Sequence, residues 1–186
     1  MRHQITDSDA FQMLASIAAK LKGHYVREGP DDPWAGSPFG WIRALPSRQV
    51  GKIGEQLVEG LCKAMGLDVK SSEDSEADLI IAGRRVEVKF STLWESGHYK
   101  FQQIRDQNYE FVVCLGVSPF DVHCWVISKD LLRQYVIGHT PQHTGKRGTD
   151  TFWLSFKATS PPEWLEACGG RLAKACEIMR EWQAKR

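Results

Sequence analysis

The spacing of apolar residues predicts two helices at the start of the chain and a change of period after them. Apolar side chains recur at helical intervals in residues 8–22, and Gly23 is expected to end that helix. A second helix is predicted from 47 to about 65, with Ser47 as its cap and Gly66 at its end. Beyond it the period falls to two, which is typical of strands.

The rest of the chain alternates between short strands and helices. Residues 110–117 form a nearly continuous apolar run, as expected of a strand buried on both faces. Segment 23–46 is rich in Gly and Pro and is predicted to be a loop whose aromatic residues pack down. We further predict strands at 67–71, 77–82, 85–91, 122–127 and 151–156, a helix at 129–136, a loop at 138–150, and a helical C-terminus from about 161, broken at Gly169-Gly170. This order predicts an α/β domain with a mixed sheet.

Composition narrows the class of protein. The chain has 186 residues, of which 42% are hydrophobic, so it is long enough for one globular domain. Its net charge of +1 disfavours a passive DNA coat but allows an enzyme that gathers basic residues in one cleft. The five cysteines include no C-x-x-C pair, which favours buried thiols and a reducing, cytoplasmic location. No apolar stretch approaches the roughly 20 residues that span a membrane.

Charged residues occupy one face of a predicted hairpin at 77–91. A two-residue turn at Gly83-Arg84 would place Ile80 opposite Glu87, and Asp78 opposite Lys89. Because side chains alternate along a strand, these four would share one face. The other face would be entirely apolar: Leu79, Ile81, Val86, Val88 and Phe90. Two carboxylates and a lysine would therefore lie together in the middle of a sheet, where burial makes charged side chains unfavourable unless something compensates them.

A divalent cation would compensate the charge of the two carboxylates. Partly buried carboxylates are costly, and Mg²⁺ is typically held by one or two of them together with waters and phosphate oxygens. Asp78 and Glu87 supply the carboxylates, and the carbonyl of Val88 could supply a third oxygen. Lys89 would lie beside the metal-bound water, where it could orient or deprotonate it. These groups suit phosphodiester hydrolysis with Mg²⁺, or with Mn²⁺ as a substitute.

The same residues resemble a known motif. Asp78, eight intervening residues and Glu87-Val88-Lys89 are similar to the D…(D/E)xK motif of the PD-(D/E)XK, or restriction-endonuclease-like, nuclease superfamily. Ala77 stands where that family usually has proline. The resemblance extends from about residue 50 to 128. It implies a restriction-endonuclease-like core, a central mixed β-sheet flanked by helices, with the motif on a hairpin.

The resemblance also implies two further catalytic residues. A helix before the hairpin often carries a glutamate in this family, and Glu55 in the segment 51–58 matches that position, with Glu59 as its rival. A glutamine after the ExK strand recurs in several branches, which favours Gln103 over Gln102. The alternative for this last segment is an ordinary amphipathic stretch.

The loop at 138–150 is a candidate DNA-binding segment. It is polar, basic and rich in glycine, and Thr144, Lys146 and Arg147 could donate hydrogen bonds to phosphates. The alternative is a surface loop without a ligand.

Together these observations predict one nuclease domain over 1–186. It would comprise an N-terminal helix and aromatic loop (1–46), the catalytic core (47–128), and a C-terminal strand and helices (129–186). We predict a Mg²⁺-dependent DNA endonuclease that resembles type II restriction enzymes. A homodimer is expected because duplex DNA has two strands to cut. The alternatives are a repair, recombination or phage nuclease of the same fold, and a non-catalytic DNA-binding member. A small metabolic α/β enzyme is disfavoured because neither G-x-G-x-x-G nor a P-loop is present.

Overall fold

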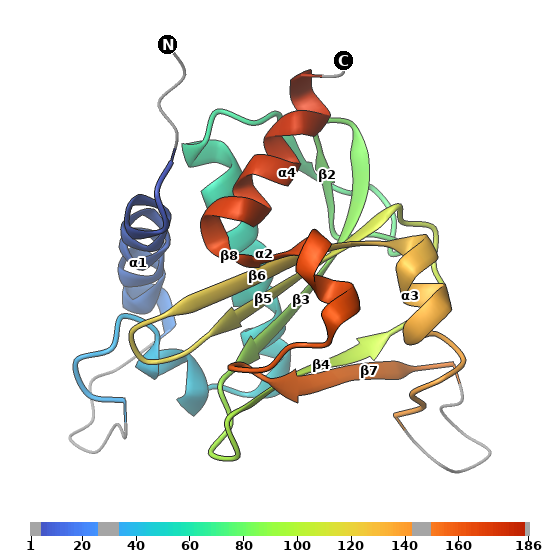
Figure 1. Ribbon diagram of the computed structural model, residues 1–186. Coiled ribbons are helices and arrows are strands. Elements are labelled where there is room, and N and C mark those ends of the chain that lie inside the picture. The colour runs from blue at the N-terminus through green and yellow to red at the C-terminus, as the bar shows by residue number, and fades with distance from the viewer. Residues whose placement is uncertain (1–4, 26–33, 143–149, 185–186) are drawn as a thin grey trace.

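A mixed β-sheet forms the centre of the molecule in the computed structural model, which describes residues 5–25, 34–142 and 150–184. Within these ranges the sheet has six strands in the order β1-β2-β3-β5-β6-β8, and only β3 and β5 run parallel. The strands are β1 (Val69–Ser71), β2 (Leu79–Ile81), β3 (Arg84–Thr92), β5 (Phe111–Val117), β6 (Val122–Ser128) and β8 (Gly169–Arg171). The predicted mixed α/β architecture, a central sheet flanked by helices, is confirmed (Figure 1).

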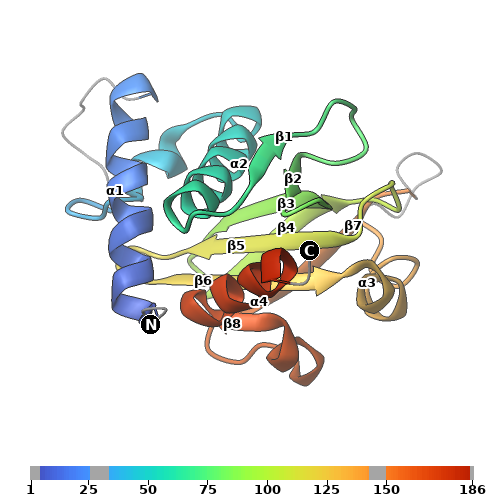
Figure 2. The ribbon, with the colours of Figure 1, turned by 90° about the horizontal axis from the view of Figure 1, so that it is seen from above.

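Helices cover one face of the sheet, and a second layer covers the other. The first face packs against α2 (Ser47–Ala64) and α4 (Leu172–Ala184), and α1 (Asp7–Tyr25) packs against these two helices in the same core. The second packs against a separate antiparallel ribbon of β4 (His98–Ile104) and β7 (Phe152–Lys157), with α3 (Lys129–Tyr135) and the 3-10 helix η2 (Glu163–Cys168). Figures 1 and 2 show α4 over the sheet and the ribbon on its opposite side. A further 3-10 helix, η1 (Gly40–Ala44), leads into α2.

The two layers give two hydrophobic cores that share β5. Val113, Leu115 and Val117 face the helices, whereas Val112 and Cys114 face the ribbon. The predicted strand at 110–117 is therefore buried on both faces, as its continuous apolar run indicated. All five cysteines are free and buried, which confirms their predicted packing role. No helix in the described ranges is long and apolar enough to cross a membrane.

Helix boundaries differ from the predicted ones at three points. Helix α1 continues through the exposed Gly23 to Tyr25, because one glycine in a helix costs only about 1 kcal/mol. The residue that precedes α2 is Pro46, and no side chain caps the helix, so the prediction of a Ser47 cap is wrong. At the C-terminus, Gly169-Gly170 does not merely break a helix: it forms part of β8, which pairs with β6.

A glycine sets the distance between α2 and β3. A Cβ atom on Gly54 would lie 2.3 Å from the Cβ of Phe90, so α2 approaches β3 more closely than any other residue would allow. Phe90 packs into the helix-side core at this point. The close approach brings the next residue of α2, Glu55, beside the charged residues in the middle of β3.

The aromatic loop before α2 packs down as predicted. Trp34, Phe39 and Trp41 are buried, and the Trp41 ring stacks on Tyr25 of α1 with 5.8 Å between centroids. The loop therefore fixes η1 beside the N-terminal half of α2.

Candidate functional site

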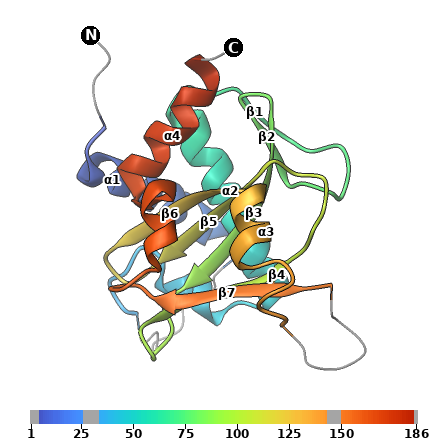
Figure 3. The same ribbon diagram turned by 45° about the vertical axis from the view of Figure 1, so that its right-hand side comes forward.

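A cleft of about 790 Å³ opens where η1, the first half of α2, β3 from its middle onward and the second half of β4 meet. Figure 3 shows α2, β3 and β4 on the same side of the molecule. The charged residues that line the cleft are Arg43, Arg48, Lys52, Glu55, Asp78, Glu87, Lys89 and Lys100. Five are basic and three are acidic, so a cleft with a net positive charge occurs on a chain whose overall charge is only +1.

The hairpin that carries Asp78 and Glu87 has a different turn from the predicted one. The turn residues are Ala82 and Gly83, both with positive φ (47° and 80°), and Leu79 pairs with Val86. Asp78 therefore lies opposite Glu87, and the predicted pairing of Asp78 with Lys89 is wrong. The register shifts by two residues, so each side chain keeps its predicted face.

Asp78 takes the place of a strand partner for β3. The β2–β3 ladder ends at the Leu79–Val86 pair. Just beyond it the Asp78 amide donates to the Val86 carbonyl at 3.0 Å, and Asp78 Oδ2 accepts from the Val88 amide at 2.7 Å. The carbonyl of Val88 points to the same edge of β3 as its amide. The carbonyl predicted as a metal ligand thus lies at the edge that carries the Asp78 carboxylate.

Glu87 and Lys89 form a shielded ion pair. The Lys89 ammonium donates to Glu87 Oε1 at 2.7 Å, and only 11% of the Glu87 side chain and 15% of the Lys89 side chain are exposed. Burial raises the pKa of the Glu87 carboxyl; the Lys89 charge opposes this rise, and the nearby Asp78 carboxylate adds to it. Two carboxylates therefore lie close together in a partly buried place, an arrangement that a divalent cation relieves.

Glu55 reaches the same cleft from α2, but it has a lysine partner. Lys52, one turn earlier, donates to Glu55 Oε2 at 2.7 Å. Burial raises the pKa of the Glu55 carboxyl, Lys52 lowers it, and the charge of Asp78 raises it further. The rival residue, Glu59, pairs with Lys63 and does not line the cleft, so the geometry favours Glu55.

Both candidate glutamines line the cleft from β4, a strand that the sequence pattern did not predict. The register of β4 against β7 shifts between Phe101 and Ile104, and Gln103 adopts a positive φ of 56°. The backbone N–H of Gln103 donates to the side-chain Oε1 of Gln142 at 2.8 Å. This bulge exposes Gln102 and Gln103 in succession, so both can face the cleft.

The sequence did not predict most of the basic residues that line the cleft, which we call its basic wall. Arg43, Arg48 and Lys100 come from three elements, and no local pattern links them. Lys52 carried a weak signal because it is three residues before Glu55 on a helix. The predicted DNA-binding residues Thr144, Lys146 and Arg147 lie outside the described residues.

The donor set of the cleft is small. Among the residues that the structure describes, no group of three or more His, Cys, Asp or Glu side chains could hold a metal ion by itself. Asp78, Glu87 and the Val88 carbonyl are all oxygen donors. This set fits a hard cation such as Mg²⁺, which keeps several waters and shares its shell with a phosphate.

Comparison with known proteins supports the fold. No protein-family model matches the sequence, and no curated protein matches it either. Among solved structures, the chain is similar to a bacterial homing endonuclease, I-Ssp6803I, with a TM-score of 0.50 and 18% sequence identity. The similarity covers 76% of this chain and 97% of that enzyme. At this identity the likeness shows the fold alone: the chain has a mixed α/β fold that an endonuclease also uses.

Proposed function

We propose that this protein is a DNA endonuclease that hydrolyses phosphodiester bonds with Mg²⁺, and that it belongs to the PD-(D/E)XK superfamily. One observation carries the proposal: Asp78, Glu87 and Lys89 converge at the open edge of β3, inside a cleft whose lining is net basic. A polyanion is attracted to such a cleft, and a cation held by its carboxylates would offset their repulsion of the phosphate that is to be cut. The similarity to a homing endonuclease agrees with DNA as the substrate.

Each residue of the site has a stated role in this proposal. Asp78, Glu87 and the Val88 carbonyl would hold Mg²⁺, and Mn²⁺ could replace it. A bound Mg²⁺ lowers the pKa of water and polarises a phosphoryl oxygen. Lys89 would orient the attacking water through its ammonium; to accept the proton of that water it would first have to release its own. Glu55 would act through water from α2, after release from Lys52.

Three of the remaining cationic residues of the cleft would bind the phosphate backbone. Arg43, Arg48 and Lys52 lie on η1 and α2, on the helix side of the carboxylates. The predicted contacts of Gln103 with the site, and of Thr144, Lys146 and Arg147 with DNA, remain part of the proposal.

A restriction-type role is the first choice within this activity, with a homodimer that cuts both strands. The alternative is a repair, recombination or phage nuclease that recognises DNA structure. A non-catalytic DNA-binding member would keep the fold without cleavage, but the three motif residues Asp78, Glu87 and Lys89 are all present and share one cleft.

Digestion of genomic DNA with Mg²⁺ separates these roles. A restriction-type enzyme gives discrete bands, and sedimentation of the protein with an uncut duplex gives the mass of two chains per duplex. A structure-directed nuclease leaves intact duplex uncut and cleaves branched or flapped substrates. If no DNA of any kind is cut with Mg²⁺ or Mn²⁺, the proposed activity is wrong.

A further inference from the structure

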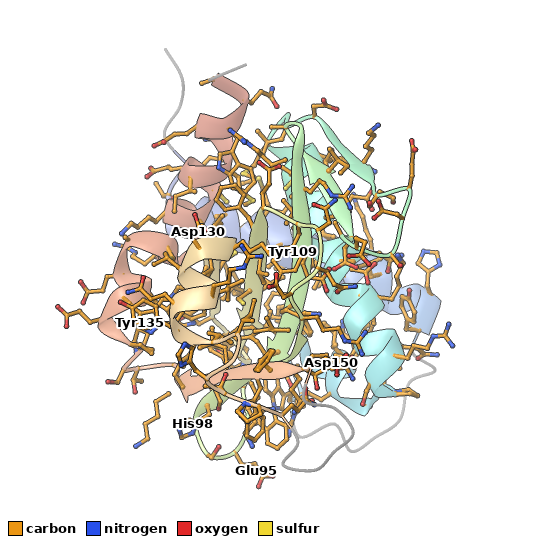
Figure 4. All side chains as sticks on the ribbon, turned by 90° about the vertical axis from the view of Figure 1, so that its right-hand side faces the viewer. Glu95, His98, Tyr109, Asp130, Tyr135 and Asp150 are labelled. Carbon is orange, nitrogen blue, oxygen red and sulfur yellow. The ribbon has the colours of Figure 1, made fainter. Side chains whose placement is uncertain are left out.

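The β4–β7 ribbon has one apolar face and one polar face. Its inner residues, Tyr99, Phe101, Phe152, Leu154 and Phe156, are buried in the ribbon-side core. Its outward residues are His98, Lys100, Gln102, Trp153, Ser155 and Lys157. Neither strand contains an acidic residue. Figure 4 shows His98 and Asp150 toward opposite ends of the ribbon.

The polar face is continuous with the cleft. Lys100 and Gln102 of β4 line the cleft together with Asp78 and Glu87 of the hairpin. The Lys100 ammonium lies 3.6 Å from the centroid of the Trp94 ring, and Trp94 is 47% exposed. This contact holds the lysine in place on the ribbon. A duplex whose backbone reached the carboxylates would therefore pass over this face.

The bulge in β4 shapes the same face. It places Gln102 and Gln103 side by side at the surface, where a regular strand would bury one of them. A bulge also increases the right-handed twist of a ribbon and redirects side chains beside active sites. The side chain of Gln142 stabilises the bulge by accepting a hydrogen bond from the backbone N–H of Gln103.

We infer that the outer face of the β4–β7 ribbon enters the major groove of duplex DNA and reads base edges through Lys100 and Gln102. This inference rests on the proposed function, because it assigns the duplex that the cleft would cut. A two-stranded ribbon fits the major groove, which is about 12 Å wide. Lysine pairs with guanine O6 and N7, and glutamine pairs with adenine N6 and N7.

The spacing of the two side chains matches the bases. Residues two apart on a strand are separated by about 6.6 Å. Successive bases on one DNA strand are about 3.4 Å apart, so Lys100 and Gln102 reach positions about two base steps from each other. The ribbon thus predicts a guanine and an adenine at this separation in the preferred sequence.

Selection from a random duplex library in EDTA tests this inference without cleavage. The wild type should enrich a motif. Replacing its purines with 7-deazapurines, which lack the N7 acceptor, should weaken binding at each contacted position by part of the roughly 5- to 150-fold that a whole bidentate pair contributes. The double variant Lys100→Ala/Gln102→Ala should lose preference at those two positions. Gln102→Arg should change the preferred adenine to guanine.

The matched control is Gln12→Ala/Lys20→Ala, which removes the same residue types from exposed positions on α1. It should enrich the wild-type motif. Thermal unfolding checks that each variant is folded. If the wild type enriches no motif, or if both ribbon variants enrich the wild-type motif, the ribbon does not read bases. If the wild type enriches a motif but does not cut DNA with Mg²⁺, the ribbon reads bases and the proposed cleavage is wrong.

Discussion

Replacing Glu87 with glutamine should stabilise the protein and abolish its activity. The Glu87 side chain is only 11% exposed, and burial, together with the Asp78 carboxylate, raises the pKa of its carboxyl in spite of the Lys89 ammonium. The folded state therefore disfavours the charged form at neutral pH. A glutamine keeps an oxygen that can accept from Lys89 and adds an amide that can donate to Asp78.

The expected gain is modest but measurable. Single stabilising substitutions commonly contribute about 0.5–2 kcal/mol to the free energy of unfolding, and we expect Glu87→Gln to fall in this range. For a chain of this size, 1 kcal/mol shifts Tm by about 2–4 °C, so Glu87→Gln should melt about 1–8 °C above the wild type at about pH 7.5 without divalent metal.

The sign of the pH dependence follows from the raised pKa. A carboxyl whose folded pKa exceeds its unfolded value destabilises the fold as pH rises through the folded pKa. Below the ordinary glutamate pKa of 4.5 the Glu87 carboxyl is protonated in both the folded and the unfolded state, so its ionisation no longer lowers the free energy of unfolding. The Tm difference between Glu87→Gln and the wild type should therefore shrink toward zero near pH 4.

Thermal unfolding at several pH values measures this difference, and Glu59→Gln is the control. Glu59 pairs with Lys63 on the same helix but outside the cleft, so its replacement should change stability by no more than about 0.5 kcal/mol. The reasoning is refuted if Glu87→Gln melts below the wild type at neutral pH, or if its gain is the same at every pH. Added Mg²⁺ at ten times its Kd should stabilise the wild type by about 1.4 kcal/mol and the variant by less.

Three further predictions concern the reaction, the packing and DNA binding. Lys89→Arg should lower the single-turnover cleavage rate about 100-fold because arginine cannot release a proton, and a rate within about twofold of wild type would exclude proton transfer by this residue. Gly54→Ala should destabilise by about 1–3 kcal/mol because its methyl group meets β3 at 2.3 Å, whereas Gly51→Ala, in open space on the same helix, should stabilise by about 1 kcal/mol; thermal unfolding compares them. Replacing Lys146 and Arg147 together with alanine should reduce the salt dependence of DNA binding by up to about two in slope, and an unchanged slope would show that these residues make no phosphate contact.

The faces of the hairpin could be predicted from sequence, but its register could not. The alternation of Val86, Val88 and Phe90 with charged residues fixes which side of the sheet each side chain occupies. The turn was misplaced because Ala82 adopts a positive φ of 47°, which is uncommon for a residue with a Cβ atom. An error of two residues preserves the faces, so the grouping of Asp78, Glu87 and Lys89 survived the wrong turn.

The β4 strand and the basic wall of the cleft depend on contacts distant in sequence. The bulge at Gln102-Gln103 interrupts the alternation by which a strand is recognised, and Gln142, which fixes it, is 39 residues away. Arg43 and Lys100 line one cleft only after the sheet and the aromatic loop have packed. Periodicity records burial along one element and does not record which elements become neighbours.

Cleavage of supercoiled plasmid by the wild type and by Asp78→Ala, side by side, tests the central claim most directly. The Asp78 carboxylate is proposed to bind Mg²⁺, so the wild type should convert supercoiled plasmid to nicked and linear forms with Mg²⁺ and should leave it intact with EDTA. Asp78→Ala should remain folded, retain DNA binding and cut nothing. A wild type that is inactive with both Mg²⁺ and Mn²⁺, or an Asp78→Ala protein that cuts at the wild-type rate, would contradict the account.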